Sequence, residues 1–275
     1  MDELCLQHLL SDEERLSFES QGYLVIKDAL PEQLVSRLEA ALIRVEAKRQ
    51  HDIDTRQGGY NWLDVIGDED LLLELIDWPT TFPKVWGILG WHIALYHSHY
   101  IVTPPLPEAF EKRRLGWHQD SGRINLDIES DPRPRISVKV GFFITDTSTQ
   151  DRGNFHVIPG SHLSNRLVLP DDESEDHPDA IPVLVSAGDA VMFDRRIWHA
   201  AGLNFSDVTR RALFLGYSYR WLKPRDNMTV AHYMDKADLI RQQLLGASPN
   251  GGFGFTSPTD EDVPLKVWLE QHLGV

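Results

Sequence analysis

The sequence predicts a mainly β fold with additional helices (α+β). We expect a double-stranded β-helix, the jelly-roll or cupin-like barrel, with flanking helices packed on one of its two sheets. The helical patterns lie before about residue 90 and again after Trp221. From Trp91 onward, short strand-like segments follow one another, separated by clusters of Pro, Asp and Gly. No helical pattern alternates with these strands, which favours an antiparallel two-sheet barrel over a parallel α/β sheet.

The N-terminal elements are predicted from capping signals and periodicity. Ser11 and Glu14 have the spacing of a capping box, in which each side chain reaches the backbone amide of the other residue. This helix should end at Gly22, where a left-handed conformation costs little, and a short strand over Tyr23–Lys27 should follow. Residues Pro31–Lys48 carry an apolar stripe at helical spacing, which should pack on the sheet. The stripe consists of Leu34, Leu38, Ala41, Leu42 and Val45.

The remaining elements follow from apolar runs between breaker residues. Further helices are expected at Leu71–Ile76, Phe82–Leu89, near Val230–Leu245 and near Pro264–Leu273. Strands are expected at Trp91–Val102, Ile136–Thr145, Phe155–Ile158, Ile181–Val185, Ala190–Phe193 and Ala212–Tyr219. We expect one domain over residues 1–275, with 222–275 as a helical C-terminal extension.

Composition and charge exclude several classes of protein. The chain has 275 residues, of which 41% are hydrophobic and 25% charged, as in ordinary soluble globular proteins. Its formal net charge of −15 argues against binding to nucleic acid or to an anionic membrane surface, because both would repel it. No stretch approaches the roughly 20 apolar residues needed to span a bilayer, and no secretory signal is expected after Asp2 and Glu3. The single cysteine, Cys5, excludes an intrachain disulfide framework, so we expect a cytoplasmic protein, as a monomer or homodimer.

Two short motifs together predict a metal site. In Trp117-His118-Gln119-Asp120, side chains two residues apart share one face if the segment is a strand, so His118 and Asp120 point together. His199, in Trp198-His199, can close the site from a second strand. Two imidazoles and one carboxylate on one face of an octahedron leave positions open, the arrangement of non-haem Fe(II) oxygenases. The motif therefore predicts a catalytic rather than a structural metal.

An arginine close to the metal indicates the co-substrate. Arg210 and Arg211 follow a predicted turn after His199 and begin the strand that ends at Tyr219. A guanidinium can bind a carboxylate through two hydrogen bonds. A dicarboxylic acid that chelates the metal at one end and meets the arginine at the other fits this arrangement, and 2-oxoglutarate has that form. Strand alternation allows only one of the two arginines to face inward.

These motifs, in this order and spacing, resemble the phytanoyl-CoA dioxygenase family of Fe(II)/2-oxoglutarate-dependent oxygenases. Weaker similarity runs from Ser11 to about Trp221. The matching segments are Leu115–Asp120, Gly153–His162, Gly188–Asp194, Trp198-His199 and Arg210–Leu213.

The resemblance implies a role for each motif residue. His118, Asp120 and His199 would bind Fe(II), and Arg210, eleven residues after the distal histidine, would hold 2-oxoglutarate. Thr103 stands where some relatives have a lysine that contacts the co-substrate, and Ala200-Ala201 stand where some have Gly-Ser. Both differences argue against assuming that the substrate is phytanoyl-CoA. Asp120 itself is present, which argues against halogenation, because related halogenases replace this carboxylate with a small residue.

Candidate substrate contacts surround these motifs. His97 and His99 share strand parity with Thr103, so all three side chains should face the barrel interior. Arg123 either holds an anionic substrate group or pairs on the surface with Asp127, Glu129 and Asp131. The segment Gly122–Pro134 is a candidate lid. Cations are concentrated around the motif at Lys112, Arg113, Arg114, Arg123, Arg133 and Arg135.

The sequence therefore predicts a dioxygenase that uses Fe(II), 2-oxoglutarate and O2 to hydroxylate a small-molecule substrate, with release of succinate and CO2. The substrate is expected to be small, and one of the two interpretations of Arg123 gives it an anionic group. Two alternatives remain at this stage. One is a zinc hydrolase that uses the same three ligands to activate water, and the other is a barrel that binds a small molecule without turnover.

Overall fold

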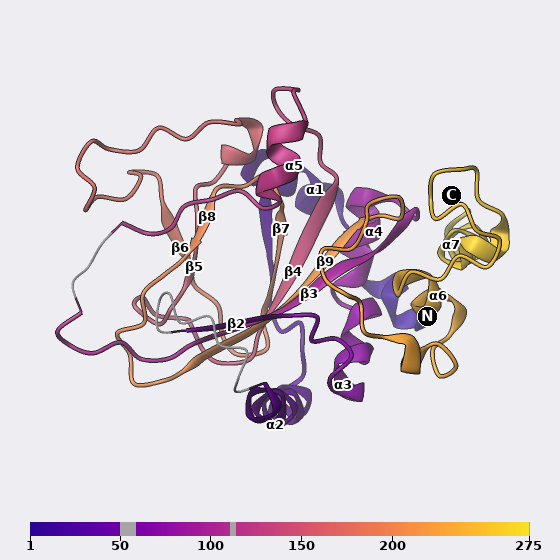
Figure 1. The fold of residues 1–275 in the computed structure, drawn as a ribbon, viewed down its shortest axis with the longest axis horizontal. Helices are drawn as coiled ribbons and strands as arrows, with labels where there is room; N and C mark the ends of the chain where they lie inside the picture. The colour runs from indigo at the N-terminus through magenta and orange to yellow at the C-terminus, as the bar shows by residue number, and fades with distance from the viewer. Residues whose placement is uncertain (50–58, 111–113, 275) are drawn as a thin grey trace.

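Two antiparallel sheets face one another across the interior of the molecule (Figure 1). The computed structural model describes residues 1–49, 59–110 and 114–274. The larger sheet has six strands, in spatial order β1 (Tyr23–Ile26), β7 (Ala190–Asp194), β4 (Ser137–Phe143), β9 (Arg210–Tyr219), β3 (Ile93–Thr103) and β2 (Tyr60–Leu63). The smaller sheet has the order β6 (Ile181–Val183), β5 (Phe155–Val157) and β8 (His199–Ala201).

Side-chain alternation along the larger sheet produces a separate apolar cluster on each face. On the outer face, Val140 of β4 and Leu215 of β9 belong to a cluster that includes Leu38 of helix α2 (Glu32–Lys48). On the inner face, Phe214 of β9 belongs to a second cluster with Phe155 of the small sheet. Because neighbouring residues of a strand point to opposite faces, one strand supplies both clusters. The inner cluster forms one wall of the barrel interior.

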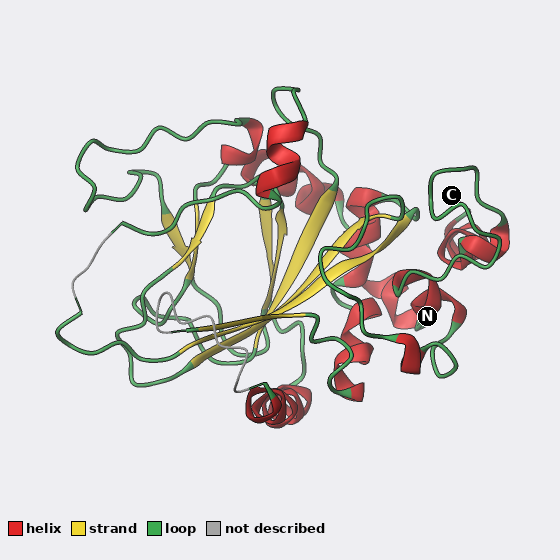
Figure 2. Ribbon diagram, in the orientation of Figure 1, coloured by secondary structure: helices red, strands yellow, loops and turns green. Residues whose placement is uncertain are grey.

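The helices pack on the outer face of the larger sheet, away from the small sheet (Figure 2). The main ones here are α2, α3 (Asp70–Leu73) and α4 (Phe82–Leu89), while α1 (Asp12–Gln21) precedes β1. Helix α1 begins with the predicted capping box between Ser11 and Glu14, and Gly22 ends it with a φ of 84°. The short 3-10 helices are η1 (Glu3–His8), η2 (Glu74–Asp77), η3 (Ser161–Leu163), η4 (Ala231–Tyr233) and η5 (Asp260–Asp262).

The C-terminal part differs from the predicted pattern. Instead of one helix near Val230–Leu245, the chain forms η4 and then α6 (Leu239–Leu244). Asp238 starts α6, because its side chain accepts a hydrogen bond from the backbone amide of Arg241 and so caps a new helix. The last helix, α7 (Pro264–Leu273), lies where it was predicted.

Two predictions around the metal motif need correction. Residues 117–120 do not form a strand, because only His118 pairs with His199, as an isolated bridge, while the Asp120 amide bonds to the carbonyl of Arg195. The segment Gly122–Pro134 is not all loop, since its first part is the short helix α5 (Gly122–Asp127). Strand β2 was not predicted, whereas β8 is the second strand expected to carry His199. In the part of the chain that the structure describes, no helix is long and apolar enough to cross a membrane.

Candidate active site

Three predicted ligands converge inside the barrel. His118 and His199 are joined by two backbone hydrogen bonds of 3.0 Å each, which hold the metal motif against β8. The ligand atoms of His118, Asp120 and His199 all lie within 4.8 Å of one another. Gln119 points away from them, with its amide donating to the carbonyls of Arg196 and Ser164. The predicted alternation therefore holds at these residues even though the segment is not a strand.

Both imidazoles are oriented by the backbone in the same way. Nδ1 of His118 lies 2.8 Å from the carbonyl oxygen of Gly116, and Nδ1 of His199 lies 2.9 Å from that of Ile197. A carbonyl can only accept, so Nδ1 carries the proton and the lone pair is on Nε2. Histidine ligands of metals are commonly oriented by such a hydrogen bond from the second nitrogen. Burial lowers the pKa of His199 to about 3, which keeps its ring neutral.

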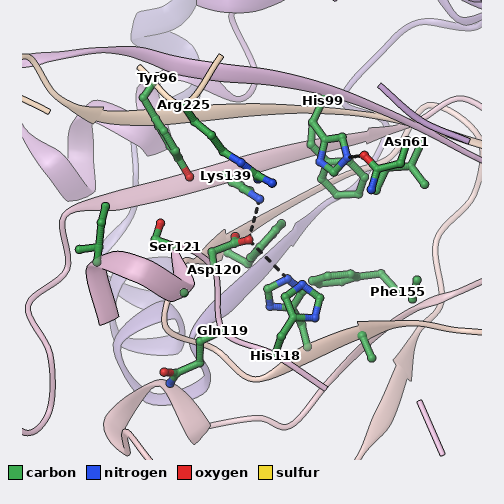
Figure 3. A pocket seen from close by; sticks show the side chains of 18 of the residues that line it. Asn61, Tyr96, His99, His118, Gln119, Asp120, Ser121, Lys139, Phe155 and Arg225 are labelled. Atoms are coloured by element: carbon green, nitrogen blue, oxygen red, sulfur yellow. Dashed lines mark hydrogen bonds and ion pairs between the residues drawn. The ribbon is translucent and has the colours of Figure 1, made fainter. Parts of the chain in front are cut away.

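Asp120 is paired with a lysine that the sequence analysis did not identify. Nζ of Lys139, on β4, lies 2.8 Å from Oδ1 of Asp120, and both side chains are buried (Figure 3). Burial alone would raise the pKa of Asp120, but the charge and hydrogen bond of Lys139, together with the two nearby histidines, outweigh burial and the pKa falls well below its usual range. The other carboxylate oxygen, Oδ2, is buried without a hydrogen-bond partner among the described residues. Asp120 is therefore ionised and keeps one oxygen free for a ligand.

Arg210 faces the interior and lacks a counter-ion. Its side chain is 2% exposed, lies over the rings of Phe143 and Phe214, and donates to the hydroxyl of Thr103 at 3.3 Å. Among the described residues, no carboxylate pairs with it, and burial lowers its pKa to about 10. Arg211 points to the outer face, where it pairs with Glu46 at 2.8 Å. Only one of the two arginines faces inward, as strand alternation requires.

The three ligand residues and Arg210 line one cavity of about 660 Å³. A volume of this order is typical of small-molecule sites. Its apolar wall includes Phe155, Phe193 and Phe214, which belong to the inner core.

The candidate substrate contacts differ in their positions. His99 lines the cavity and bonds to Asn61 of β2, while Thr103 lines a smaller cavity of about 300 Å³ beside it. His97 shares their face of β3 but is fully buried. Arg123 lines the larger cavity, is 81% exposed and pairs with Asp127 four residues later. The structure thus shows Arg123 in a surface ion pair, which is one of the two roles that the sequence allowed for this residue.

The other cations near the metal motif have structural partners. Arg135 pairs with Glu19 and with the buried Asp194, rather than with the nearby acidic residues. Arg133 donates to the carbonyl of Asn125, and Arg114 to backbone carbonyls of the loop at 170–175. Lys112 and Arg113 lie outside the described residues.

Several residues of the site were missed by sequence reasoning. Tyr96, Lys139 and Arg225 line the cavity together with Asn61 (Figure 3). Lys139 had one available signal, since it is a lysine inside an otherwise apolar strand. Asp176 ends an acidic run at 171–176, and its carboxylate accepts hydrogen bonds from the Leu115 amide and the Trp117 indole.

The donor set fits a divalent iron ion. Two imidazoles that present their Nε2 atoms and one ionised carboxylate are nitrogen and oxygen ligands of the type that non-haem Fe(II) sites use. The unpartnered Oδ2 of Asp120 and the cavity beside the three residues are consistent with a metal that keeps further positions open.

Comparison with known proteins agrees with this geometry. The family model described as phytanoyl-CoA dioxygenase matches residues 18–212. The chain belongs to the phytanoyl-CoA dioxygenase family. This is a family of Fe/2-oxoglutarate-dependent oxygenases, and the His-Asp-His set is present here. An uncharacterised protein of Mycobacterium tuberculosis is 28% identical over 202 residues, which cover 70% of this chain and 69% of that protein.

Solved structures of oxygenases share the fold. HygX from Streptomyces hygroscopicus, with nickel and 2-oxoglutarate bound, has a TM-score of 0.63 at 18% identity, and the match covers 78% of this chain and 89% of that one. EctD from S. alaskensis, with 2-oxoglutarate and 5-hydroxyectoine, has a TM-score of 0.62 at 20% identity, covering 78% and 79%. The predicted double-stranded β-helix with helices on one sheet is therefore confirmed.

Proposed function

We propose that this member of the phytanoyl-CoA dioxygenase family hydroxylates a small-molecule substrate, using Fe(II), 2-oxoglutarate and O2, with release of succinate and CO2. One observation carries the proposal. Three candidate metal ligands line the same cavity as a buried arginine that has no counter-ion among the described residues. A buried cation is costly unless an anion pairs with it, and the distal carboxylate of 2-oxoglutarate is an anion of the right kind.

Each residue has a defined task in this proposal. His118 and His199 would bind iron through Nε2, because their Nδ1 atoms are held by carbonyls. Asp120 would bind as a carboxylate, oriented by Lys139. When bound, the iron and 2-oxoglutarate supply the oxidising chemistry that converts a C–H bond to a hydroxyl group.

The remaining residues would position the co-substrate and exclude water. Arg210, supported by the hydroxyl of Thr103, would pair with the far carboxylate of 2-oxoglutarate. Phe155, Phe193 and Phe214 give the cavity an apolar wall, which strengthens the charge interactions inside it. The substrate would bind in the space that remains, with its reacting carbon toward the three ligands.

The proposal is tested by loading the purified protein with Fe(II) and measuring release of CO2 from 2-oxoglutarate labelled at its C1 carboxylate. We expect iron-dependent release of CO2 and formation of succinate, and an Asp120→Ala variant should lose both. Product mass from a substrate screen distinguishes hydroxylation from other oxidations, since hydroxylation adds one oxygen atom. Turnover by hydrolysis with zinc, or binding without turnover, would overturn the proposal.

We also propose that residues 1–275 act as one catalytic unit. Leu222, Lys223 and Arg225 belong to the C-terminal extension and line the same cavity as the metal ligands. The cytoplasmic location and the monomeric or dimeric state remain predictions.

A further inference from the structure

A second arginine, Arg225, lines the active-site cavity from the C-terminal extension; it is exposed, unlike Arg210, and no carboxylate of the described residues forms an ion pair with it. Arg225 follows β9 and lies outside the segment 18–212 that matches the family model. In Figure 3 its guanidinium points into the cavity toward the amine of Lys139, above Asp120.

The backbone of Arg225 is fixed at the cavity wall. Its amide donates to the carbonyl of Tyr96 at 2.7 Å, at an irregularity of β3 between Leu95 and His97. Such bulges commonly redirect side chains beside active sites. The next residue, Asp226, accepts hydrogen bonds from the backbone amides of Ser98 at 2.9 Å, Asp64 at 3.2 Å and Met228 at 3.0 Å. The carboxylate of Asp226, the residue after Arg225, is thus hydrogen-bonded to backbone amides.

The cavity has more cations than the proposed co-substrate needs. Its charged lining residues are Asp120 and the cations Arg123, Lys139, Arg210, Lys223 and Arg225. Arg123 pairs with Asp127, Lys139 pairs with Asp120, and Arg210 is assigned to 2-oxoglutarate. Within the described residues, no carboxylate forms an ion pair with Arg225 or with Lys223. Two cations therefore remain, in a chain whose net charge of −15 would otherwise repel an anion.

Arg210 and Arg225 are held at different positions along β3. Arg210 bonds to Thr103, whereas Arg225 is attached at Tyr96 on the same strand. Extended backbone rises about 3.3 Å per residue, so these attachment points are roughly 20 Å apart along β3. One arginine can serve the co-substrate while the other serves a second ligand.

We propose that the substrate is a small organic oxyanion, a carboxylate, phosphonate or phosphate monoester, whose anionic group pairs with Arg225 while its carbon skeleton faces the metal ligands. A guanidinium suits such groups because it can donate two parallel hydrogen bonds to them. Lys223, which is also exposed and lines the same cavity, adds a second positive charge that attracts the anion. This inference rests on the proposed function, because it assigns the substrate of the same site.

The test uses calorimetry on full-length protein loaded with Mn²⁺ and saturated with 2-oxoglutarate, so that Arg210 is already occupied. Propionate, methylphosphonate and inorganic phosphate are titrated as anionic probes, with neutral N-methylpropionamide as the comparison. We expect at least one anion to bind the wild type and the amide not to bind. Arg225→Gln should weaken anion binding by roughly 10- to 100-fold, as expected for loss of a charged hydrogen bond.

Two controls make the result specific. Arg37→Gln removes one positive charge from an exposed position on α2, away from the cavity, and should leave anion binding unchanged. Binding of 2-oxoglutarate to the Mn²⁺-loaded Arg225→Gln variant should stay within about twofold of the wild type.

Each contrary outcome has a distinct meaning. Equal binding of anions to wild type and Arg225→Gln, or no anion binding at all, would overturn this inference. A loss of 2-oxoglutarate affinity in Arg225→Gln as large as the loss for the anions would also overturn it, because Arg225 would then contact the co-substrate. Failure of the wild type to bind 2-oxoglutarate would instead contradict the proposed function.

Discussion

At the scale of single residues, the site depends on charged groups that lack part of their ion-pair or hydrogen-bond partners among the described residues. Arg210 is buried without a counter-ion, and Asp120 has one oxygen paired with Lys139 and one unpartnered among the described residues. In ion pairs elsewhere in the structure, such as Arg135 with Asp194, each charge has an opposite charge as its partner. Buried groups that lack a partner commonly mark the places where a protein receives a ligand.

Substitution of the two adjacent arginines should have opposite consequences. Arg210→Gln should weaken 2-oxoglutarate binding by roughly 100-fold, because it removes a two-bond contact to a carboxylate. Arg211→Gln should leave that affinity within about twofold, since Arg211 pairs with Glu46 on the outer face of the sheet. Calorimetry with Mn²⁺-loaded variants measures both. Equal losses would contradict the assignment of Arg210.

The stability of the same variants provides an independent control. Without 2-oxoglutarate, Arg210→Gln should not lower the free energy of unfolding, because it removes a buried charge that has no counter-ion. A large loss of stability in that variant would indicate that Arg210 has a structural role.

At the scale of elements, strand β9 serves the site and the core at once. Its residues Arg210 and Phe214 face the cavity, whereas Leu213 and Leu215 belong to the outer cluster that includes α2. Period-two alternation makes this division possible, and it also means that α2, packed on the outer face, supports the strand that carries the site from the opposite side.

We expect core substitutions on α2 to affect stability and not the site. Leu38 is fully buried, so Leu38→Ala should lower the free energy of unfolding by about 2 to 5 kcal/mol. Ile43 is 46% exposed on the same helix, and Ile43→Ala should cost less than about 1 kcal/mol. Urea unfolding measures both changes, and 2-oxoglutarate affinity of the folded variants should be unchanged. A similar loss for the two variants would contradict the packing of α2.

At the scale of the whole molecule, the barrel brings distant segments together and excludes water from the groups they carry. His97 and His99 of β3 and His199 of β8 are all buried, and burial is the largest cause that lowers their pKa values. Each is therefore neutral in the folded protein over a pH range in which the unfolded chain takes up a proton.

Stability of the metal-free protein should consequently fall as pH decreases below 7. The pKa of His199 is about 3 when folded, against 6.5 for an unperturbed group, so the unfolded state binds more protons between these values. Stability is then greatest above pH 6.5 and decreases toward pH 3, by about 2 kcal/mol at pH 5 from this residue alone. Urea unfolding at pH 7 and pH 5 should show the decrease, and His199→Gln should reduce it by a similar amount. An unchanged pH dependence in that variant would refute the assignment.

Much of the fold was predictable because it depends on local patterns. The capping box at Ser11, the apolar stripe of α2 and most strands of the barrel follow from residue types and spacing along the chain. A strand carrying His199 was expected, but β8 is only three residues long and no pattern gave its bounds. The break before α6 depends on whether Asp238 caps a helix.

For the site, the sequence alone determined the three metal-ligand candidates and the inward position of one arginine, because both follow from motif spacing and alternation within a segment. The tertiary structure decided that Lys139 pairs with Asp120, that Asp176 anchors the metal motif, and that Arg225 reaches the cavity. The residues that meet in these contacts are far apart in sequence. Lys139 and Asp120 are separated by 19 positions, and Arg225 and Tyr96 by about 130. Periodicity specifies the face on which a side chain lies, but the neighbouring strand or loop that meets it is set by the closure of the barrel.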